Sequence, residues 1–281
     1  MKIVLLSDTH VAARAHAFNA NLRAVLDWVR TLQPDLIVHL GDITADGVAE
    51  DGELEFAARQ FDSVEAPLYF LPGNHDIGEN PAAPGRHADP PLSLARLSEY
   101  RNVLGSDWWT IRRAGWQLIG LNASLFATAD PEEERQFAWL EAQLAQGDGA
   151  LGVLLHKPLF RAGRADREIH DRYVPWETRE RLLRMLETRN LRFVFSGHTH
   201  QARRLQVGAV EHIWVPSTSF YIPDALQEPI GTKIVGVGIL ELGGRETGHG
   251  TYQFEFVSPA GVIRHNLFDH PEVYPVIKEL R

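Results

Sequence analysis

The sequence predicts an α/β fold in which two β-sheets pack face to face and helices cover the outer surfaces. Up to residue 75, short apolar runs alternate with helix-patterned segments, as in a β-α-β-α-β unit with parallel strands. After residue 200 the helical pattern stops, and short strand-like segments separated by turns follow. The 281 residues, 44% of them hydrophobic, suffice for a large core. Without a linker, repeat or low-complexity tract, we expect one domain over residues 1–281.

The N-terminal elements follow from the spacing of apolar residues. Residues 3–6 form an uninterrupted apolar run, which is typical of a strand covered on both faces. Between residues 19 and 32, apolar side chains recur at helical spacing, and Pro34 ends the helix. The other elements of this unit are a strand at 36–38, a helix at 53–61 and a strand at 68–71.

The middle of the chain resumes the alternation after a less regular stretch. Residues 77–109 are rich in Pro, Ala and Asp, and we expect a loop and helix there that border the functional site. The sequence leaves open whether a small lid or cap lies within 77–110. The elements that follow are strands at 116–121, 151–155 and 193–195 and helices at 132–146 and 177–189.

The last third reads as a mostly antiparallel sheet. Turns that contain Gly, Pro or Ser separate apolar segments, and no helical spacing remains. The predicted strands are 205–207, 212–215, 234–242, 252–257 and 262–267.

Composition excludes several classes of function. The formal charge of −9 and the pI near 5.8 argue against a general nucleic-acid binder, although bound metal ions would still allow a phosphate substrate. The absence of cysteine excludes disulfides, thiolate metal sites and cysteine nucleophiles, and it fits a cytoplasmic location. The apolar run at 3–6 is too short for a secretion signal, and no stretch approaches the roughly 20 apolar residues of a membrane span.

Metal-ligand residue types follow five of the predicted strands. Each motif alone is weak, since Gly-Asp and Gly-Asn are common turn dipeptides and a lone histidine is usually a surface or core residue. Together, in order and at the carboxyl ends of apolar strands, where open α/β sheets bind ligands, they are specific. The motifs are Asp8-Thr9-His10, Gly41-Asp42, Gly73-Asn74-His75-Asp76, His156 and Gly197-His198-Thr199-His200.

These motifs supply only oxygen and nitrogen donors, a set that suits Mn, Fe or Zn. Seven donors are too many for one ion that keeps a free position, whereas two ions that share a carboxylate account for all of them. Two-metal sites serve in-line displacement at phosphorus, where one ion helps generate hydroxide and both stabilise the phosphoryl oxygens. The imidazoles of His198 and His200 share one side if that segment is extended. The candidates are Asp8, His10, Asp42, Asn74, His156, His198 and His200.

The ordered set of motifs resembles the calcineurin-like metallophosphoesterase superfamily over roughly residues 2–200. The resemblance implies a four-layer α/β/β/α sandwich of two mixed sheets, with two metal ions bridged by Asp42. It places Asp8, His10 and His200 on one ion, and Asn74, His156 and His198 on the other. It also implies that His75, held by Asp76, is a catalytic residue that contacts phosphate or assists the leaving group beside Asn74.

Within that superfamily, the form Leu-Pro-Gly-Asn-His-Asp and the chain length look most like bacterial cyclic-nucleotide and glycerophosphodiester phosphodiesterases. The expected activity is therefore hydrolysis of a small-molecule phosphodiester. Protein phosphatases of the superfamily carry an arginine shortly after Gly-Asp, and residues 43–47 contain none. The alternatives are a phosphomonoesterase, a nucleotide pyrophosphohydrolase, a nuclease, which the acidic balance disfavours, and a catalytically silent scaffold such as a retromer subunit.

Two further segments carry predictions about binding. The basic loop at 160–175 offers Arg161, Arg164 and His170 as contacts for an anionic substrate, or else as solvated surface charge. The segment 266–281 carries apolar residues such as Val273, Tyr274 and Ile277. We expect it to dock either on a neighbouring subunit, which would give a homo-oligomer, or on the core of its own chain.

Overall fold

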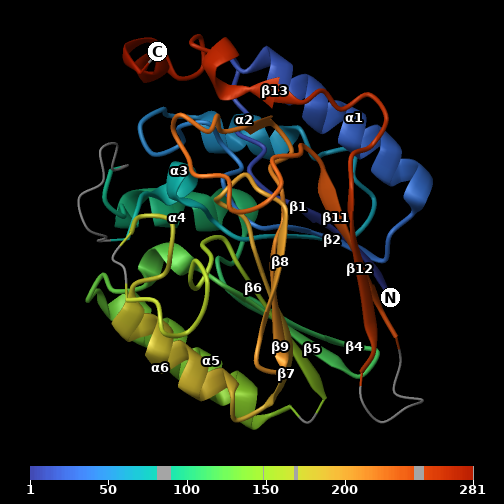
Figure 1. Cartoon of the computed structure of the whole chain (residues 1–281), viewed down its shortest axis with the longest axis vertical. Helices are drawn as coiled ribbons and strands as arrows, with labels where there is room; N and C mark the ends of the chain where they lie inside the picture. Colours follow the sequence, from blue (N-terminus) through green and yellow to red (C-terminus); the bar gives the residue numbers. More distant parts are fainter. Residues whose placement is uncertain (81–89, 148, 168–169, 244–249, 281) are drawn as a thin grey trace.

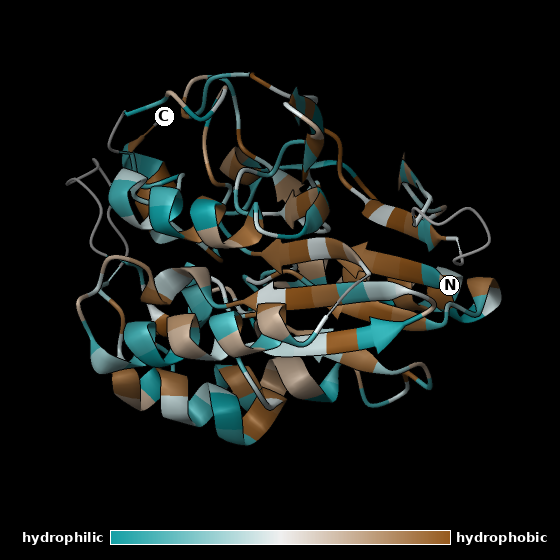
Figure 2. Ribbon diagram, turned by 90° about the horizontal axis from the view of Figure 1, so that it is seen from below, coloured by the Kyte–Doolittle hydropathy of each residue, from teal (hydrophilic) through white to brown (hydrophobic). Residues whose placement is uncertain are grey.

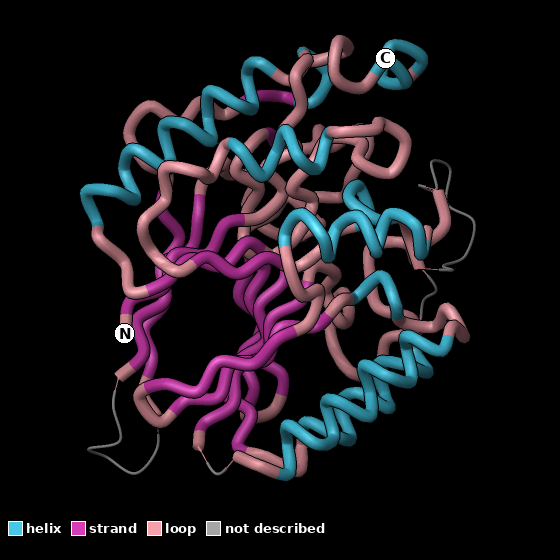
Figure 3. The backbone as a smooth tube through the Cα atoms, turned by 180° about the vertical axis from the view of Figure 1, so that it is seen from behind, coloured by secondary structure: helices cyan, strands magenta, loops and turns pink. Residues whose placement is uncertain are grey.

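A computed structural model describes residues 1–80, 90–147, 149–167, 170–243 and 250–280 (Figure 1). Two β-sheets face each other at the centre, and helices lie on their outer sides (Figure 3). The central strands are predominantly hydrophobic, whereas the helices around them mix hydrophilic and hydrophobic residues (Figure 2). The predicted four-layer α/β/β/α sandwich is confirmed.

The first sheet contains the N-terminal β-α-β-α-β unit. Its order is β12-β11-β1-β2-β3, with β1, β2 and β3 parallel and with β11 and β12 antiparallel. The buried face of α1 consists mainly of the apolar residues whose spacing predicted it. The elements are β1 (Lys2–Leu6), α1 (His16–Leu32), β2 (Leu36–His39), α2 (Glu53–Arg59), β3 (Leu68–Phe70), β11 (Val237–Leu242) and β12 (Tyr252–Val257).

The second sheet has the order β4-β5-β6-β7-β9-β8. Strands β5, β6, β7 and β9 are parallel, and the edge strands β4 and β8 are antiparallel to their neighbours. Helices α5 and α6 cover its outer face. The elements are β4 (Trp109–Arg113), β5 (Trp116–Leu121), η1 (Ala123–Leu125), α5 (Pro131–Ala145), β6 (Ala150–Leu155), α6 (Trp176–Leu186), β7 (Asn190–Ser196), β8 (Arg203–Val207) and β9 (Val210–Trp214).

A shared core between the sheets fixes the carboxyl ends of both sets of parallel strands at one side of the molecule. Leu5 and Val38 of the first sheet belong to the same buried cluster as Leu154 and Phe195 of the second. Two further clusters lie between each sheet and its helices. Because both sheets are held on both faces, the loops at these strand ends start from rigid positions.

The C-terminal third differs from its prediction. Its four longer strands do not form one sheet, because β8 and β9 extend the second sheet whereas β11 and β12 extend the first. The segment predicted as a strand at 262–267 contains only β13 (His265–Asn266), which pairs in parallel with β10 (Phe220–Tyr221), and the 3₁₀ helices η3 (Leu267–Asp269) and η4 (Pro275–Glu279) follow. Apolar spacing reveals that a strand is present, but it does not specify the strand's partner.

The stretch predicted as a loop and helix, 77–109, begins at the last residue of α3 (Asn74–Ile77) and contains α4 (Leu94–Leu104) and the start of β4. Strand β4 was not predicted. Helix α4 packs against α2 and α3, beside the strand ends. Residues 81–89 lie outside the described residues, so the lid within 77–110 stays a prediction, as does the single domain. Among the described residues, no helix has the length and apolarity needed to cross a membrane.

The burial of His212 in β9 predicts that the free energy of unfolding of this protein depends on pH. His212 is 5% exposed, its ring lies 4.5 Å from that of Phe160, and burial lowers its pKa to about 4. In the unfolded chain this pKa is about 6.5, so below pH 6.5 the unfolded state binds the proton first. The stability is present above pH 6.5 and is lost as pH falls toward 4. We expect a loss of about 2 kcal/mol between pH 7 and pH 5 from this residue.

Urea unfolding of the wild type and of His212→Phe at both pH values measures this contribution. The phenylalanine keeps an aromatic ring beside Phe160 and removes the titrating group. The variant should lose less stability on acidification than the wild type, and equal losses would contradict the assignment.

Candidate metal centre

All seven predicted donors lie at the carboxyl ends of strands, and they come from both sheets. Asp8 and His10 follow β1, Asp42 follows β2, and Asn74 begins α3 directly after β3. From the second sheet, His156 follows β6, and His198 and His200 follow β7. Six of the seven are at most 3% exposed, and His198 is partly exposed. The structure therefore brings together residues that are up to 192 positions apart in the sequence.

Five of the seven donors have left-handed backbone conformations. Their φ angles are 52° at Asp8, 46° at His10, 52° at Asp42, 65° at His198 and 52° at His200. The segment from His198 to His200 is therefore not extended, and the condition under which the sequence would place both imidazoles on one side is not met. In both Asp8-Thr9-His10 and His198-Thr199-His200, the residues on either side of the threonine are left-handed. This backbone turns both donor side chains of each motif toward the cluster. Such a backbone costs roughly 1–2 kcal/mol per residue, so the site stores strain.

Two glycines beside the donors are required by close approach. A Cβ atom on Gly73 would lie 2.1 Å from Oδ1 of Asp42, and one on Gly41 would lie 2.7 Å from Nδ1 of His156. Gly41 also has φ +113°, which other residues rarely adopt. The glycines of the Gly-Asp and Gly-Asn pairs thus pack directly against the donor side chains.

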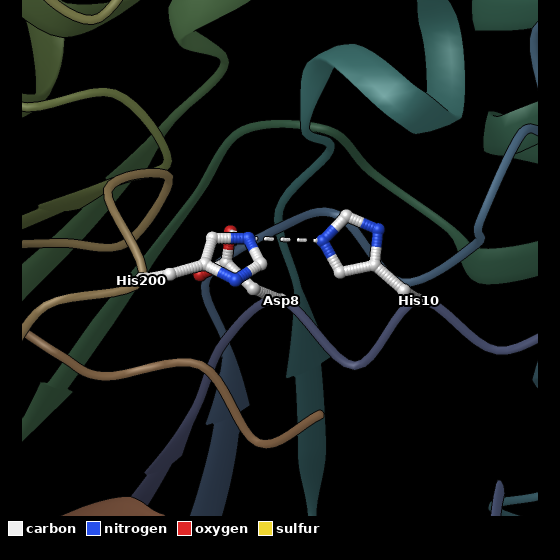
Figure 4. Close-up of side chains that lie close together, drawn as sticks. All are labelled: Asp8, His10 and His200. Carbon is white, nitrogen blue, oxygen red and sulfur yellow. Dashed lines mark hydrogen bonds and ion pairs between the residues drawn. The ribbon is translucent and has the colours of Figure 1, made fainter. Parts of the chain in front are cut away.

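Asp8, His10 and His200 form the first half of the site (Figure 4). Nε2 of His200 lies 3.4 Å from Oδ1 of Asp8 and 3.2 Å from Nε2 of His10. Nδ1 of His200 faces the Phe220 carbonyl at 2.9 Å and must donate to it, since a carbonyl only accepts. This tautomer leaves the Nε2 lone pair directed toward His10. Two imidazole nitrogens facing each other across a carboxylate fit a cation between them.

Asp42, Asn74, His156 and His198 form the second half. Nε2 of His156 lies 3.2 Å from Oδ1 of Asn74 and 3.2 Å from Nδ1 of His198. Nδ1 of His156 donates to the Leu40 carbonyl at 3.0 Å, so Nε2 is the nitrogen that would exchange its proton for a metal ion. The donor types and the tautomers set by backbone carbonyls suit a metal ion here too.

Asp42 lies between the two halves. Its Oδ2 is 3.1 Å from Nε2 of His156 and 3.9 Å from Nε2 of His10. Its Oδ1 accepts the backbone N–H of His75 at 2.9 Å. One carboxylate thus faces histidines of both halves, which is the arrangement that a shared ligand requires.

The electrostatics of the cluster favour positive charge within it. Burial opposes ionisation of Asp42, but the attraction of His156 and His75 outweighs it and holds the pKa of Asp42 well below its usual range. Burial likewise opposes charge on His156, and Asp42 overcomes it to raise the pKa of His156 to about 9. Burial lowers the pKa values of His10 and His198 well below the usual range, so these rings are neutral, the form that binds metal.

The described contacts give the Asp76 carboxylate backbone partners, and its predicted hold on the His75 ring stays a prediction. Nδ1 of His75 contacts the Ala45 carbonyl at 2.8 Å. The Asp76 carboxylate accepts the backbone N–H groups of Gly73, Ile43 and Thr44 at 2.8–3.2 Å. Burial and the nearby Asp42 raise the pKa of Asp76 to about 6. Asp76 therefore fixes the two loops that present Asp42 and Asn74.

Three of the predicted substrate contacts, those from the basic loop, lie in ion pairs outside the ligand cluster. Arg161 pairs with Glu228, Arg164 pairs with Glu180 and Glu187, and His170 pairs with Asp171. The arginines are 41% and 40% exposed, so these pairs are surface features. Their role in substrate binding stays a prediction.

Several residues that support the donors were not predicted. Ser7 Oγ donates to Oδ2 of Asp8, and the hydroxyls of Ser217 and Ser219 donate to the Asp8 carbonyl at 2.8 and 2.7 Å. Tyr274 contacts His10. Ser7 was identifiable, because it precedes the first ligand. The others belong to distant segments with no motif of their own.

Comparison with known proteins agrees with this geometry. A model of the calcineurin-like phosphoesterase family matches residues 1–202. The chain is 29% identical over 239 residues to the glycerophosphodiester phosphodiesterase GpdQ of Enterobacter lignolyticus, covering 79% of each chain. It is 28% identical over 229 residues to the 3′,5′-cyclic adenosine monophosphate phosphodiesterase CpdA of Escherichia coli, covering 78% of this chain and 76% of CpdA.

Solved structures share the fold at lower identity. A dimetal phosphatase from Danio rerio superposes with a TM-score of 0.61 at 15% identity, covering 90% of this chain and 98% of that one. GAP50, the anchor in the inner membrane complex of Plasmodium, gives a TM-score of 0.62 at 15% identity, with coverage of 94% and 86%. These two likenesses concern the fold alone. From the match over residues 1–202 and the phosphodiesterase relatives, the chain belongs to the calcineurin-like phosphoesterase family and is a metal-dependent phosphoric ester hydrolase.

Proposed function

We propose that this protein hydrolyses small-molecule phosphodiesters of the cyclic-nucleotide or glycerophosphodiester type with two metal ions. Asp8, His10 and His200 would hold one ion, and Asn74, His156 and His198 the other, with Asp42 shared. Mn, Fe or Zn all suit these donors. The observation that carries the proposal is the convergence of all seven donors on one buried cluster. The two phosphodiesterase relatives support the diester preference. The cytoplasmic location stays a prediction.

Two metal ions supply a nucleophile from water near neutral pH and stabilise charge on the phosphoryl oxygens. The protein's own residues do the rest. The backbone carbonyls of Leu40 and Phe220 fix the tautomers of His156 and His200, so that their Nε2 atoms face the cluster. His75 is turned by the Ala45 carbonyl through Nδ1, and its Nε2 is the nitrogen that would transfer a proton to the leaving oxygen.

A substrate panel with metal depletion and reconstitution tests the proposal. Chelation should abolish hydrolysis, and restoring Mn, Fe or Zn should recover it with two equivalents bound. We expect bis(p-nitrophenyl) phosphate to be cleaved faster than p-nitrophenyl phosphate, and cyclic AMP or a glycerophosphodiester to be a substrate. A preference for the monoester would favour a phosphomonoesterase. A metal-replete protein that cleaves no phosphate ester would contradict the proposed activity and favour a catalytically silent scaffold.

A further inference from the structure

The C-terminal segment docks on its own chain, beside the metal centre. Val273 is 3% exposed and packs in a cluster with Phe18, Ala45 and Phe220. The Val273 carbonyl also accepts a hydrogen bond from Nε of Arg14 at 3.4 Å. Of the two docking alternatives considered for this segment, the structure thus selects the chain's own core. The contact places the next residue, Tyr274, against the ligand cluster.

The Tyr274 hydroxyl reaches a metal ligand. Its Oη lies 2.6 Å from Nδ1 of His10 and 3.4 Å from the Ala45 carbonyl oxygen. The Tyr274 ring centroid is 5.9 Å from that of His10 and 5.8 Å from that of His75. Tyr274 thus lies beside both His10 of the first ligand motif and the proposed catalytic residue His75.

The tautomer of His10 decides which atom donates in the contact between His10 and Tyr274. Nε2 of His10 faces the cluster, 3.2 Å from Nε2 of His200. A neutral imidazole that binds metal through Nε2 carries its proton on Nδ1. That N–H then donates to Tyr274 Oη, and the phenol O–H is left to donate to the Ala45 carbonyl. In His156 and His200 the Nδ1–H group donates to a backbone carbonyl, whereas in His10 it donates to the Tyr274 side chain.

The Ala45 carbonyl oxygen contacts both His75 and Tyr274. It accepts from Nδ1 of His75 at 2.8 Å and lies within reach of the Tyr274 hydroxyl. Ala45 itself is buried in the cluster that holds Val273. The docked C-terminal segment therefore contacts His10 directly and shares the Ala45 carbonyl with His75.

We propose that Tyr274 is a positioning residue of the metal centre, which fixes the tautomer and orientation of His10 as a ligand. The inference rests on the proposed two-metal function and deepens it. The C-terminal segment is then part of the active site, although the family match ends at residue 202. Loss of an outer partner of a metal-bound histidine typically lowers metal affinity about 10–100-fold.

The substitution Tyr274→Phe tests this role, because it removes the hydroxyl and keeps the ring. Calorimetric titration of metal-depleted full-length protein with Mn²⁺ measures both sites without relying on activity. We expect one of the two binding steps to weaken about 10–100-fold and the other to change little. Unchanged affinities in the variant, with two steps present in the wild type, would overturn the inference.

Tyr252→Phe is the matched control. Tyr252 also loses a hydroxyl contact, to Glu211 at 2.7 Å, but it lies at the end of the first sheet opposite to the metal centre. Its two Mn²⁺ affinities should equal those of the wild type, and equal weakening in both variants would indicate a general structural effect and overturn the inference. A wild type that binds no pair of Mn²⁺ ions would instead count against the proposed function itself.

Discussion

Replacing Asp42 with asparagine is expected to lower phosphodiester hydrolysis about a thousandfold while the fold persists. Asparagine has the same size but no charge, and its amide N–H₂ group cannot serve as the second ligand oxygen. Stabilisation by two clamped metal ions is worth several kcal/mol, and about 4 kcal/mol corresponds to three orders of magnitude in rate. The geometric reason is that Oδ2 of Asp42 faces histidines from both halves of the site.

The turnover number on bis(p-nitrophenyl) phosphate, the metal content and the thermal midpoint together measure this effect. Asp35→Asn is the control, because Asp35 precedes the same strand, β2, that Asp42 follows, and it contacts the backbone of Lys2 at the opposite end of the sheet. The control should retain both metal ions and full activity. Near-normal turnover in Asp42→Asn would remove the basis for a shared carboxylate.

Replacing His75 with alanine is expected to leave both metal ions bound and to slow the chemical step by roughly 10²–10⁴-fold. The ring lies at the edge of the cluster, with its centroid 4.8 Å from that of His10. Its Nδ1 is engaged by Ala45, so proton transfer falls to Nε2. The loss should be large for cyclic AMP or a glycerophosphodiester, whose leaving alkoxide needs a proton. It should be smaller for bis(p-nitrophenyl) phosphate, whose leaving group is stable without one.

Metal analysis separates this role from that of a ligand. His75, His10 and Asp42 can also place donor atoms within 4.8 Å of one another. Loss of a metal equivalent in His75→Ala would therefore show that His75 is a ligand. His212→Phe, which removes a buried histidine from β9, should change neither metal content nor kcat.

The donors were predictable because each is tied to an apolar strand. Residues 3–6 and 151–155 are unmistakable as buried strands, and the rule that parallel strands present ligands at their carboxyl ends placed Asp8 and His156 together. Strand partners were not predictable, since apolar runs such as β9 and β11 fit either sheet equally well. The left-handed turns at His198 and His200 were missed because residue types alone do not reveal φ.

The backbone contacts of Asp76 and the contact of Tyr274 with His10 could not be predicted, for a different reason. Proximity in sequence suggested that Asp76 orients His75, whereas its carboxylate faces backbone N–H groups of a loop more than 30 positions earlier. Tyr274 reaches His10 across 264 positions, and nothing in its neighbourhood marks it. Contacts of this kind depend on packing of the whole chain, which local pattern does not encode.

The left-handed ligand residues have an evolutionary consequence. Each holds its backbone in a conformation that glycine would adopt without penalty, so the donor atom and an unstrained chain are mutually exclusive at five positions. Under the proposed function, selection for thermal stability alone would replace these residues, whereas selection for turnover would retain them. A lineage that gave up catalysis would be free to relax there first, so these loops should be the earliest to diverge in any inactive descendant.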